Sequence, residues 1–176
     1  GVERRPALLE DGKRLENCVC LVTGASRGIG KGIALELGHQ GATVYVTGTT
    51  TTGQSTNNTP GTIEETADLI DDAGGKGIAI KCNHAVDSEV QDLMNRIEKE
   101  HGRLDILVNN VFRLPEGNIE LLNKKFWEAG PAAWDSIHQV GLRSHYVATA
   151  YATPLLFKAR DSTSLPRPLV VMISSF

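Results

Sequence analysis

Short apolar runs alternate with longer amphipathic segments along most of the chain. The apolar runs are rich in β-branched residues and have the length of strands; they lie at residues 19–22, 43–47, 77–82, 104–108 and 169–173. The segments expected to be helical lie at residues 31–38, from 62 to the glycines at 74–75, from 88 to 101, and at 134–157. Strands that alternate with helices predict an α/β fold with a doubly wound parallel sheet and right-handed crossovers.

Local signals set the expected ends of several elements. Thr62–Glu65 and Ser88–Gln91 have the capping-box pattern, in which the first side chain caps the helix that follows. Pro154 is expected to bend or end the last helix, because proline lacks a backbone N–H. Residues 112–133 contain glycine and proline breaks and are expected to be irregular, whereas the long polar segment 48–61 is expected to be a mobile loop.

The length of 176 residues predicts one domain. Residues 1–16 are polar and form a peripheral arm in this interpretation, and residues 17–176 form the domain. A full doubly wound sheet has six strands, so we expect a sheet that is incomplete after strand five. No run reaches the roughly 18 apolar residues of a membrane span, and the first residues lack the apolar core of a signal peptide. We therefore expect no transmembrane segment and a cytoplasmic or organelle-associated location.

Composition and charge argue against several classes of function. The formal net charge of −3 disfavours a nucleic-acid partner, which requires a basic surface. Three cysteines, an odd number, do not form a disulfide framework and are interpreted as buried, reduced thiols. The five histidines are scattered without the spacing of metal ligands, so no metal site is expected and each is interpreted as a surface or core residue.

The first strand leads through a glycine turn into a helix. The turn contains Gly24, Gly28 and Gly30. Glycine permits a positive φ and a close approach of the backbone to a ligand, and the N–H groups at a helix N-terminus bind anions. The spacing is Gly-x-x-x-Gly-x-Gly, which differs from the common Gly-x-Gly-x-x-Gly pattern. Taken alone, this stretch is therefore compatible with a dinucleotide pyrophosphate site or with a simple connection.

Three motifs in the same order resemble the short-chain dehydrogenase/reductase family. Thr23–Gly30 resembles the cofactor motif of that family, and Asn109–Asn110 resembles the start of its Asn-Asn-Ala-Gly motif. Val111–Phe112 departs from the last two positions of that motif. Ser175, at the end of the last apolar run, matches the catalytic serine. The resemblance covers residues 17–176 and implies a Rossmann-type dinucleotide-binding domain.

Three further segments resemble one branch of the family, dehydrogenase/reductase member 1. They lie at residues 123–128, 134–137 and 140–146. The polar segment at 49–61 is then an insertion peculiar to this chain.

The resemblance implies hydride transfer between a nicotinamide cofactor and a carbonyl or alcohol substrate. The family uses Asn, Ser, Tyr and Lys; its Lys lowers the pKa of the Tyr phenol, and its Ser polarises the substrate oxygen. Ser175 matches the serine, whereas Gly141 stands at the position of the helix asparagine. The chain contains no Tyr-x-x-x-Lys, so we expect it to be the cofactor-binding part of a longer reductase. Without the resemblance, Ser174 and Ser175 are interpreted as strand-end capping hydroxyls.

The expected cofactor-binding residues follow the carboxyl ends of the strands. They are Gly24, Ser26, Arg27, Gly28, Ile29, Gly30, Thr49, Asn83, Asn109 and Asn110. No acidic residue follows the strand at 43–47 to bind a ribose 2′-hydroxyl. Arg27 can pair with a 2′-phosphate, which favours NADP(H) over NAD(H); a solvated Arg27 is the alternative. Asn83 stands where the family has an aspartate that faces the adenine.

Two functions from different classes follow. The leading hypothesis is a short-chain NADP(H)-dependent oxidoreductase that acts on a small-molecule carbonyl or alcohol, and the resemblance implies a homo-oligomer. The alternative is a nucleotide-binding regulatory module without turnover. Gly141 and the missing Tyr and Lys favour that alternative.

Overall fold

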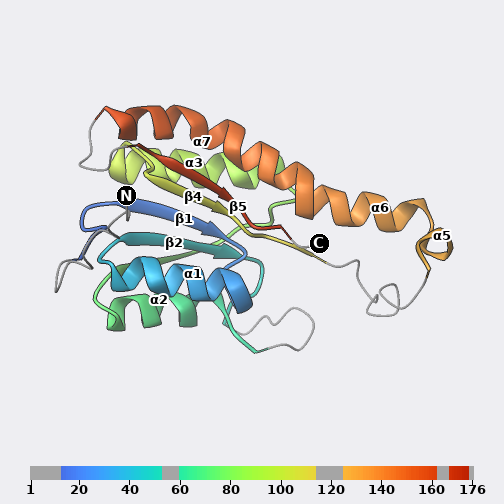
Figure 1. The fold of residues 1–176 in the computed structure, drawn as a ribbon, viewed down its shortest axis with the longest axis horizontal. Helices are drawn as coiled ribbons and strands as arrows, with labels where there is room; N and C mark the ends of the chain where they lie inside the picture. Colours follow the sequence, from blue (N-terminus) through green and yellow to red (C-terminus); the bar gives the residue numbers. More distant parts are fainter. Residues whose placement is uncertain (1–12, 53–59, 114–124, 162–166, 175–176) are drawn as a thin grey trace, which may run out of the picture.

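The computed structural model describes residues 13–52, 60–113, 125–161 and 167–174. Its elements, in chain order (Figure 1), are β1 (Val19–Thr23), α1 (Gly28–His39), β2 (Thr43–Gly48), α2 (Ile63–Asp72), β3 (Lys76–Lys81), α3 (Asp87–His101), β4 (Ile106–Asn109), α5 (Phe126–Ala129), α6 (Pro131–His138), the π-helical turn η1 (Gln139–Arg143), α7 (Ser144–Arg160) and β5 (Leu169–Met172). The alternation of strands and helices predicted from the hydrophobic pattern is confirmed.

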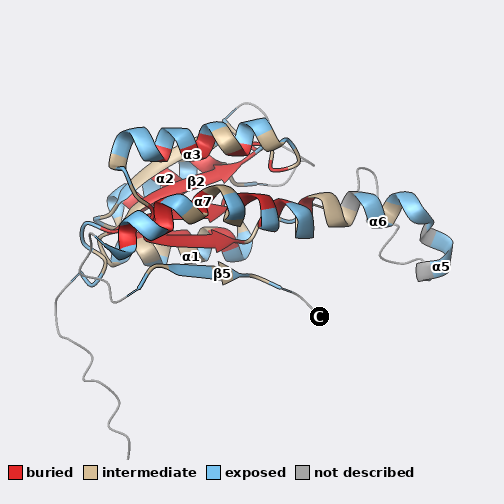
Figure 2. Ribbon diagram, turned by 90° about the horizontal axis from the view of Figure 1, so that it is seen from above, coloured by how far each residue is buried: buried red, intermediate tan, exposed pale blue. Residues whose placement is uncertain are grey.

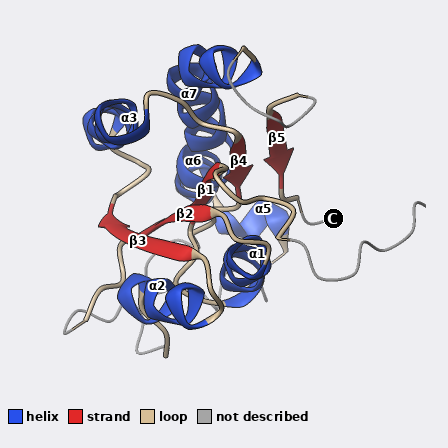
Figure 3. Ribbon diagram, turned by 90° about the vertical axis from the view of Figure 1, so that its left-hand side faces the viewer, coloured by secondary structure: helices blue, strands red, loops and turns tan. Residues whose placement is uncertain are grey.

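The strands form one parallel sheet between two layers of helices. The strand order is β3-β2-β1-β4-β5, and every neighbouring pair is parallel. Helices α3 and α7 cover one face of the sheet and α1 and α2 cover the other (Figure 3). This order matches the first five strands of a doubly wound sheet and confirms the predicted fold class.

The central strand β1 is buried along its whole length. This burial explains why its sequence is a continuous apolar run and does not alternate between apolar and polar residues. Leu21 packs with residues of α3 and α7, whereas Cys18, Cys20 and Val22 pack with residues of α1 and α2. Strands that are buried on both faces have this pattern. Cys18 and Cys20 lie on the same face, and burial raises the pKa of the Cys20 thiol. All three cysteines are buried and carry free thiols.

Strand β5 differs from the central strands in exposure. It lies at the edge of the sheet and pairs with β4. Its residues Leu169 and Met172 are 51% and 52% exposed. Figure 2 shows the central strands buried and β5 largely exposed. The carboxyl end of β5 therefore lies at an open side of the sheet.

The helical region after residue 125 departs from the prediction. Part of the segment expected to be irregular, 112–133, forms α5 and the start of α6. Pro131 begins α6 because the first residue of a helix needs no N–H partner. Pro154 does not end α7, which continues to Arg160. Buried residues on both sides of Pro154, such as Ala152 and Leu155, hold this part of the helix against the core.

The two predicted helix caps have different outcomes. The backbone N–H of Glu65 donates to Thr62 Oγ1 at 3.0 Å, so the predicted cap of α2 is confirmed. The predicted cap at Ser88 is wrong, because α3 begins at Asp87 without a side-chain cap. Asp87 instead pairs with Arg143 of η1, which draws the start of α3 toward that turn.

The predicted loop and arm lie partly outside the described residues. Of the segment 48–61, residues 53–59 lie outside, and of the arm at 1–16, residues 1–12 lie outside. In the described part of the arm, the backbone N–H of Leu15 donates to the Gln40 carbonyl oxygen, and Leu15 packs against the core beside α1.

Candidate functional site

The loops after β1, β2, β3 and β4 surround a cavity of about 280 Å³ at the carboxyl edge of the sheet. We call it the first cavity; its lining residues are Gly24, Ser26, Arg27, Gly48, Thr49, Thr50, Cys82, Asn83, His84, Val111, Phe112, Arg113 and Val140. Open α/β sheets bind ligands at this edge, where neighbouring loops diverge. Five of the predicted cofactor-binding residues therefore lie together: Gly24, Ser26, Arg27, Thr49 and Asn83.

Each glycine of the turn after β1 meets a different requirement. Gly24 has φ +67°, and a Cβ there would lie 2.7 Å from the Cα of Val111. A Cβ at Gly30 would lie 2.3 Å from Asn110 Nδ2. Gly28 has φ +58° and open space where a Cβ would stand. The first and last glycines thus allow close packing, and the middle one leaves the backbone accessible to a ligand.

The N-terminus of α1 has the properties of an anion site. Its N-cap residue, Arg27, is extended and makes no side-chain cap, and the first turn has no acidic residue. The helix dipole therefore presents uncompensated positive charge at Gly28 and the residues after it.

Arg27 adds a guanidinium group to the same cavity. Its Nη2 donates to Thr50 Oγ1 and to the Gly61 carbonyl oxygen, both at 3.1 Å. These bonds hold the side chain across the loop after β2, so Arg27 is positioned by the protein and is not simply solvated. Arg113, which the sequence analysis did not single out, also lines the cavity. None of the described lining residues is acidic, so the cavity favours an anionic ligand.

Asn83 is held at the end of β3 by its own loop. Its backbone N–H donates to a carboxylate oxygen of Glu89 at 2.7 Å, and its Oδ1 accepts from the backbone N–H of Ala85 at 3.1 Å. The amide N–H₂ has no hydrogen-bond partner among the described residues. Asn83 therefore retains donors for a ligand in the first cavity.

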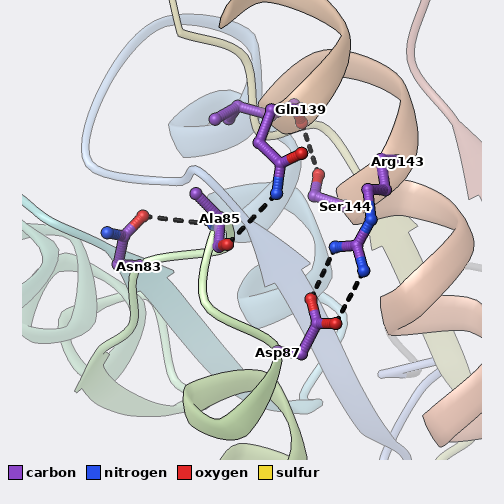
Figure 4. A network of polar contacts seen from close by, with 7 residues as sticks. Asn83, Ala85, Asp87, Gln139, Arg143 and Ser144 are labelled. Carbon is purple, nitrogen blue, oxygen red and sulfur yellow. Dashed lines mark hydrogen bonds and ion pairs between the residues drawn. The ribbon is translucent and has the colours of Figure 1, made fainter. Parts of the chain in front are cut away.

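Two residues of the turn η1, Gln139 and Arg143, tie it to this loop and to the start of α3 (Figure 4). Gln139 Nε2 donates to the Ala85 carbonyl oxygen at 3.3 Å, and Arg143 pairs with Asp87 through two contacts of 2.6 and 2.7 Å. The guanidinium lowers the pKa of the Asp87 carboxyl. These contacts fix the position of η1 relative to Asn83.

The two predicted asparagines at the end of β4 do not line the first cavity. Asn109 is fully buried, and its Nδ2 donates to Thr149 Oγ1 at 2.9 Å. Asn110 Nδ2 donates to the carbonyl oxygens of Thr23 and Gly24 at 3.0 and 2.9 Å. Asn110 thus holds the glycine turn in place, and Asn109 joins β4 to α7.

A second cavity of about 610 Å³ lies beyond the glycine turn, beside η1 and the end of β5. Its lining residues are Ile29, Asn110, Val111, Phe112, Ile137, His138, Gly141, Leu142, His145, Met172, Ile173 and Ser174. None of them is aspartate, glutamate, lysine or arginine. The predicted cofactor-binding residues Ile29 and Asn110 lie in this cavity, and Val111 and Phe112 line both.

Two buried histidines near the cavities were interpreted only as surface or core residues. His84 lines the first cavity; its Nε2 lies 2.8 Å from Thr47 Oγ1, and its Nδ1 is buried without a hydrogen-bond partner in the described structure. Burial, with a smaller effect of nearby His145, lowers the pKa of His84 to about 4. Both imidazoles are almost completely inaccessible to solvent. Nothing in the sequence indicated that these two histidines lie close together, because they are 61 positions apart.

The predicted catalytic serine, Ser175, lies outside the described residues. The preceding residue, Ser174, lines the second cavity. Trp127 and Trp134 are each 66% exposed. Within the described ranges, no group of three His, Cys, Asp or Glu residues is arranged to hold a metal ion, and no helix is long and apolar enough to cross a membrane.

Comparisons with known proteins agree with this geometry. A family model described as short chain dehydrogenase matches residues 18–175. Dehydrogenase/reductase SDR family member 1 from Mus musculus and from Homo sapiens is 40% identical over 158 residues, which is 89% of this chain and 46% of each relative. The chain therefore spans about half the length of these relatives.

Solved structures show the same similarity. The crystal structure of a metagenomic short-chain oxidoreductase in complex with NADP has a TM-score of 0.75 and 28% sequence identity. The similarity covers 93% of this chain and 64% of that one.

Proposed function

Because the chain belongs to the short-chain dehydrogenase family, close to the dehydrogenase/reductase member 1 branch, we propose that it binds NADP(H) in preference to NAD(H). In this proposal it is the cofactor-binding part of an oxidoreductase that transfers hydride between the nicotinamide and a carbonyl or alcohol substrate. The observation that carries the preference is the guanidinium of Arg27 in a cavity whose described lining has no carboxylate.

The residues of the first cavity and of the glycine turn beside it fit a phosphorylated dinucleotide. The accessible backbone at Gly28 and the uncapped N-terminus of α1 would hold the pyrophosphate. Arg27 and Thr49 would hold the 2′-phosphate, and Asn83 would donate to the adenine. In the family pattern Asn109 and Asn110 belong to the cofactor site; here they would support it by fixing β4 and the glycine turn.

The second cavity fits the reacting end of the complex. When bound, the nicotinamide supplies or accepts the hydride. The apolar walls of the cavity would exclude water from the substrate carbon. We assign to Ser175 the role of orienting the substrate oxygen by a hydrogen bond, which is supported by the position of Ser174 in the cavity wall.

A regulatory module without turnover has less support. The matched family and the most similar relatives carry the names of dehydrogenases and reductases. The feature that favours this alternative is Gly141, which stands at the position of the helix asparagine of the family. The homo-oligomer stays a prediction.

The cofactor preference is tested by Arg27→Gln, with NADPH and NADH affinities measured by isothermal titration calorimetry. A charge-assisted hydrogen bond contributes about 1.5–3 kcal/mol, so NADPH affinity should fall roughly 10- to 100-fold. NADH affinity should stay within about twofold, since NADH lacks the 2′-phosphate.

The matched control is Arg160→Gln, which removes an exposed arginine paired with Asp161 at the far end of α7. It should change neither affinity. Equal loss of NADPH and NADH affinity in Arg27→Gln would indicate a structural role of Arg27 and would contradict the proposed preference.

A further inference from the structure

The segment Asn110–Phe112 crosses from the glycine turn to η1 and forms part of both cavities. At its start, the side-chain amide of Asn110 donates hydrogen bonds to the carbonyl oxygens of Thr23 and Gly24. At its middle, Val111 lies so close to Gly24 that a Cβ there would clash with its backbone. The position of the segment is therefore fixed on the side of the first cavity.

The other side of the segment is fixed by His145 of α7. His145 Nε2 lies 2.9 Å from the Val111 carbonyl oxygen. A carbonyl oxygen only accepts hydrogen bonds, so Nε2 carries the proton and donates. His145 is 5% exposed, so the imidazole side of this bond is buried. Phe112, the next residue, is positioned by this anchor.

The ring of Phe112 lies against Gly141. A Cβ at Gly141 would stand 3.2 Å from Phe112 Cδ2 and 3.6 Å from Cε2, so any larger residue would press on the ring. Gly141 lies in the π-helical turn η1, where the helix is locally widened. The departures of residues 112 and 141 from the family pattern therefore meet in space, and the small residue makes room for the large one.

Phe112 also lies between the two cavities. Among the described residues, only Val111 and Phe112 line both. The first cavity, at about 280 Å³, is at the lower limit of ligand pockets, which hold roughly 300–1,000 Å³. A dinucleotide with its phosphates at α1 must therefore pass Phe112 to reach the second cavity. The ring is 58% exposed and available to such a ligand.

We propose that Phe112, which packs against Gly141, contacts the nicotinamide half of the bound dinucleotide. The ring separates this half from the adenosine half, and it stacks on or packs edge-on against the nicotinamide or its ribose. This inference rests on the proposed function.

The test is Phe112→Ala, with the affinities for NADPH and for 2′,5′-ADP measured by calorimetry. The second ligand contains only the adenosine half. Loss of an aromatic contact should weaken NADPH binding about three- to tenfold and leave 2′,5′-ADP binding within about twofold. The matched control is Phe157→Ala, because Phe157 is also 58% exposed but lies on α7 away from both cavities. It should change neither affinity.

A second variant tests the seat of the ring. Gly141→Ala should displace Phe112 and weaken NADPH binding in the same direction, again without an effect on 2′,5′-ADP. In the double variant the two losses should not add, because both act through the same ring.

Three results would overturn the proposal. They are an unchanged or tighter NADPH affinity in Phe112→Ala, an equal loss for both ligands, or additive losses in the double variant. If the unmodified protein binds neither ligand, the proposed function itself fails, and this inference fails with it. If it binds both ligands and Phe112→Ala changes nothing, only this inference fails.

Discussion

The two cavities at the carboxyl edge of the sheet differ in the side chains that surround them. Arg27, Arg113 and Asn83 face the first, together with hydroxyl groups of the loop after β2. The second is surrounded mainly by aliphatic and aromatic side chains, such as Ile137 and Leu142. The first suits a charged, hydrogen-bonding ligand, and the second suits an uncharged group that must be kept from water.

The difference follows from the elements that form each cavity. Loops after the central strands form most of the first, and these strands are buried on both faces, so polar residues gather only where the strands end. Residues of η1 and of β5 line the second, and β5 is the exposed strand in Figure 2. One sheet edge therefore offers two environments, separated by the residues Val111 and Phe112.

The largest effect is expected from Gly30→Ala, which breaks both cavities at once. The new Cβ would lie 2.3 Å from Asn110 Nδ2 and 2.5 Å from the Gly24 carbonyl oxygen. Overpacking of this kind costs about 1–3 kcal/mol, and displacement of the turn should lower NADPH affinity at least roughly tenfold. Urea unfolding and calorimetry measure the two effects.

Gly32→Ala is the control in the same helix, because a Cβ at Gly32 meets nothing within 4 Å. It should stabilise the protein by about 0.5–1 kcal/mol through helix propensity and leave NADPH binding unchanged. Equal behaviour of the two variants would contradict the packing role of Gly30.

A separate, pH-dependent effect on stability is expected from protonation of His84, which lines the first cavity. The folded-state pKa of His84 is about 4, against about 6.5 in the unfolded chain. The unfolded state thus binds more protons between these values, so stability falls as pH falls from 6.5 to 4. The loss attributable to His84 is on the order of 3 kcal/mol.

The variant His84→Gln keeps a partner for Thr47 but does not titrate, so its free energy of unfolding should fall less over this pH range. Urea unfolding at several pH values measures the difference, with the exposed His39→Gln as control. The same pH dependence in His84→Gln and in the unmodified protein would contradict the buried, neutral state of His84.

The smallest effect is expected from Arg113→Gln. This variant removes one positive charge from the first cavity and so tests the difference in charge between the two cavities. Arg113 is partly exposed, and such a charge contributes about 0.5–1 kcal/mol to an ionic contact. NADPH and NADH affinities should both fall roughly two- to fivefold, and less at high salt. A loss confined to NADPH would instead place Arg113 at the 2′-phosphate beside Arg27.

Local sequence patterns predicted most of the strands and helices and part of the lining of the first cavity. The strands, the glycine turn and five of the residues that line the first cavity were predicted because their signals lie within a few consecutive residues. Asn83 was predicted from the family resemblance, and it lies in the loop after β3. Helix α6 was missed at its start because Pro131 was interpreted as a break rather than as a first helical residue.

The rest depends on contacts between distant residues. Phe112 and Gly141 each look like a departure from a pattern, and only the fold shows that one fills the space left by the other. The closeness of His84 and His145 likewise arises where the loop after β3 meets α7. No local rule links such pairs, because the sheet order brings their elements together.

The most direct test of the two-cavity account is a crystal structure of the protein with NADPH. The account predicts the 2′-phosphate at Arg27, the adenine near Asn83 and the nicotinamide beyond Phe112 in the second cavity. Both halves of the nucleotide on one side of Phe112, or a nucleotide bound away from the glycine turn, would contradict it.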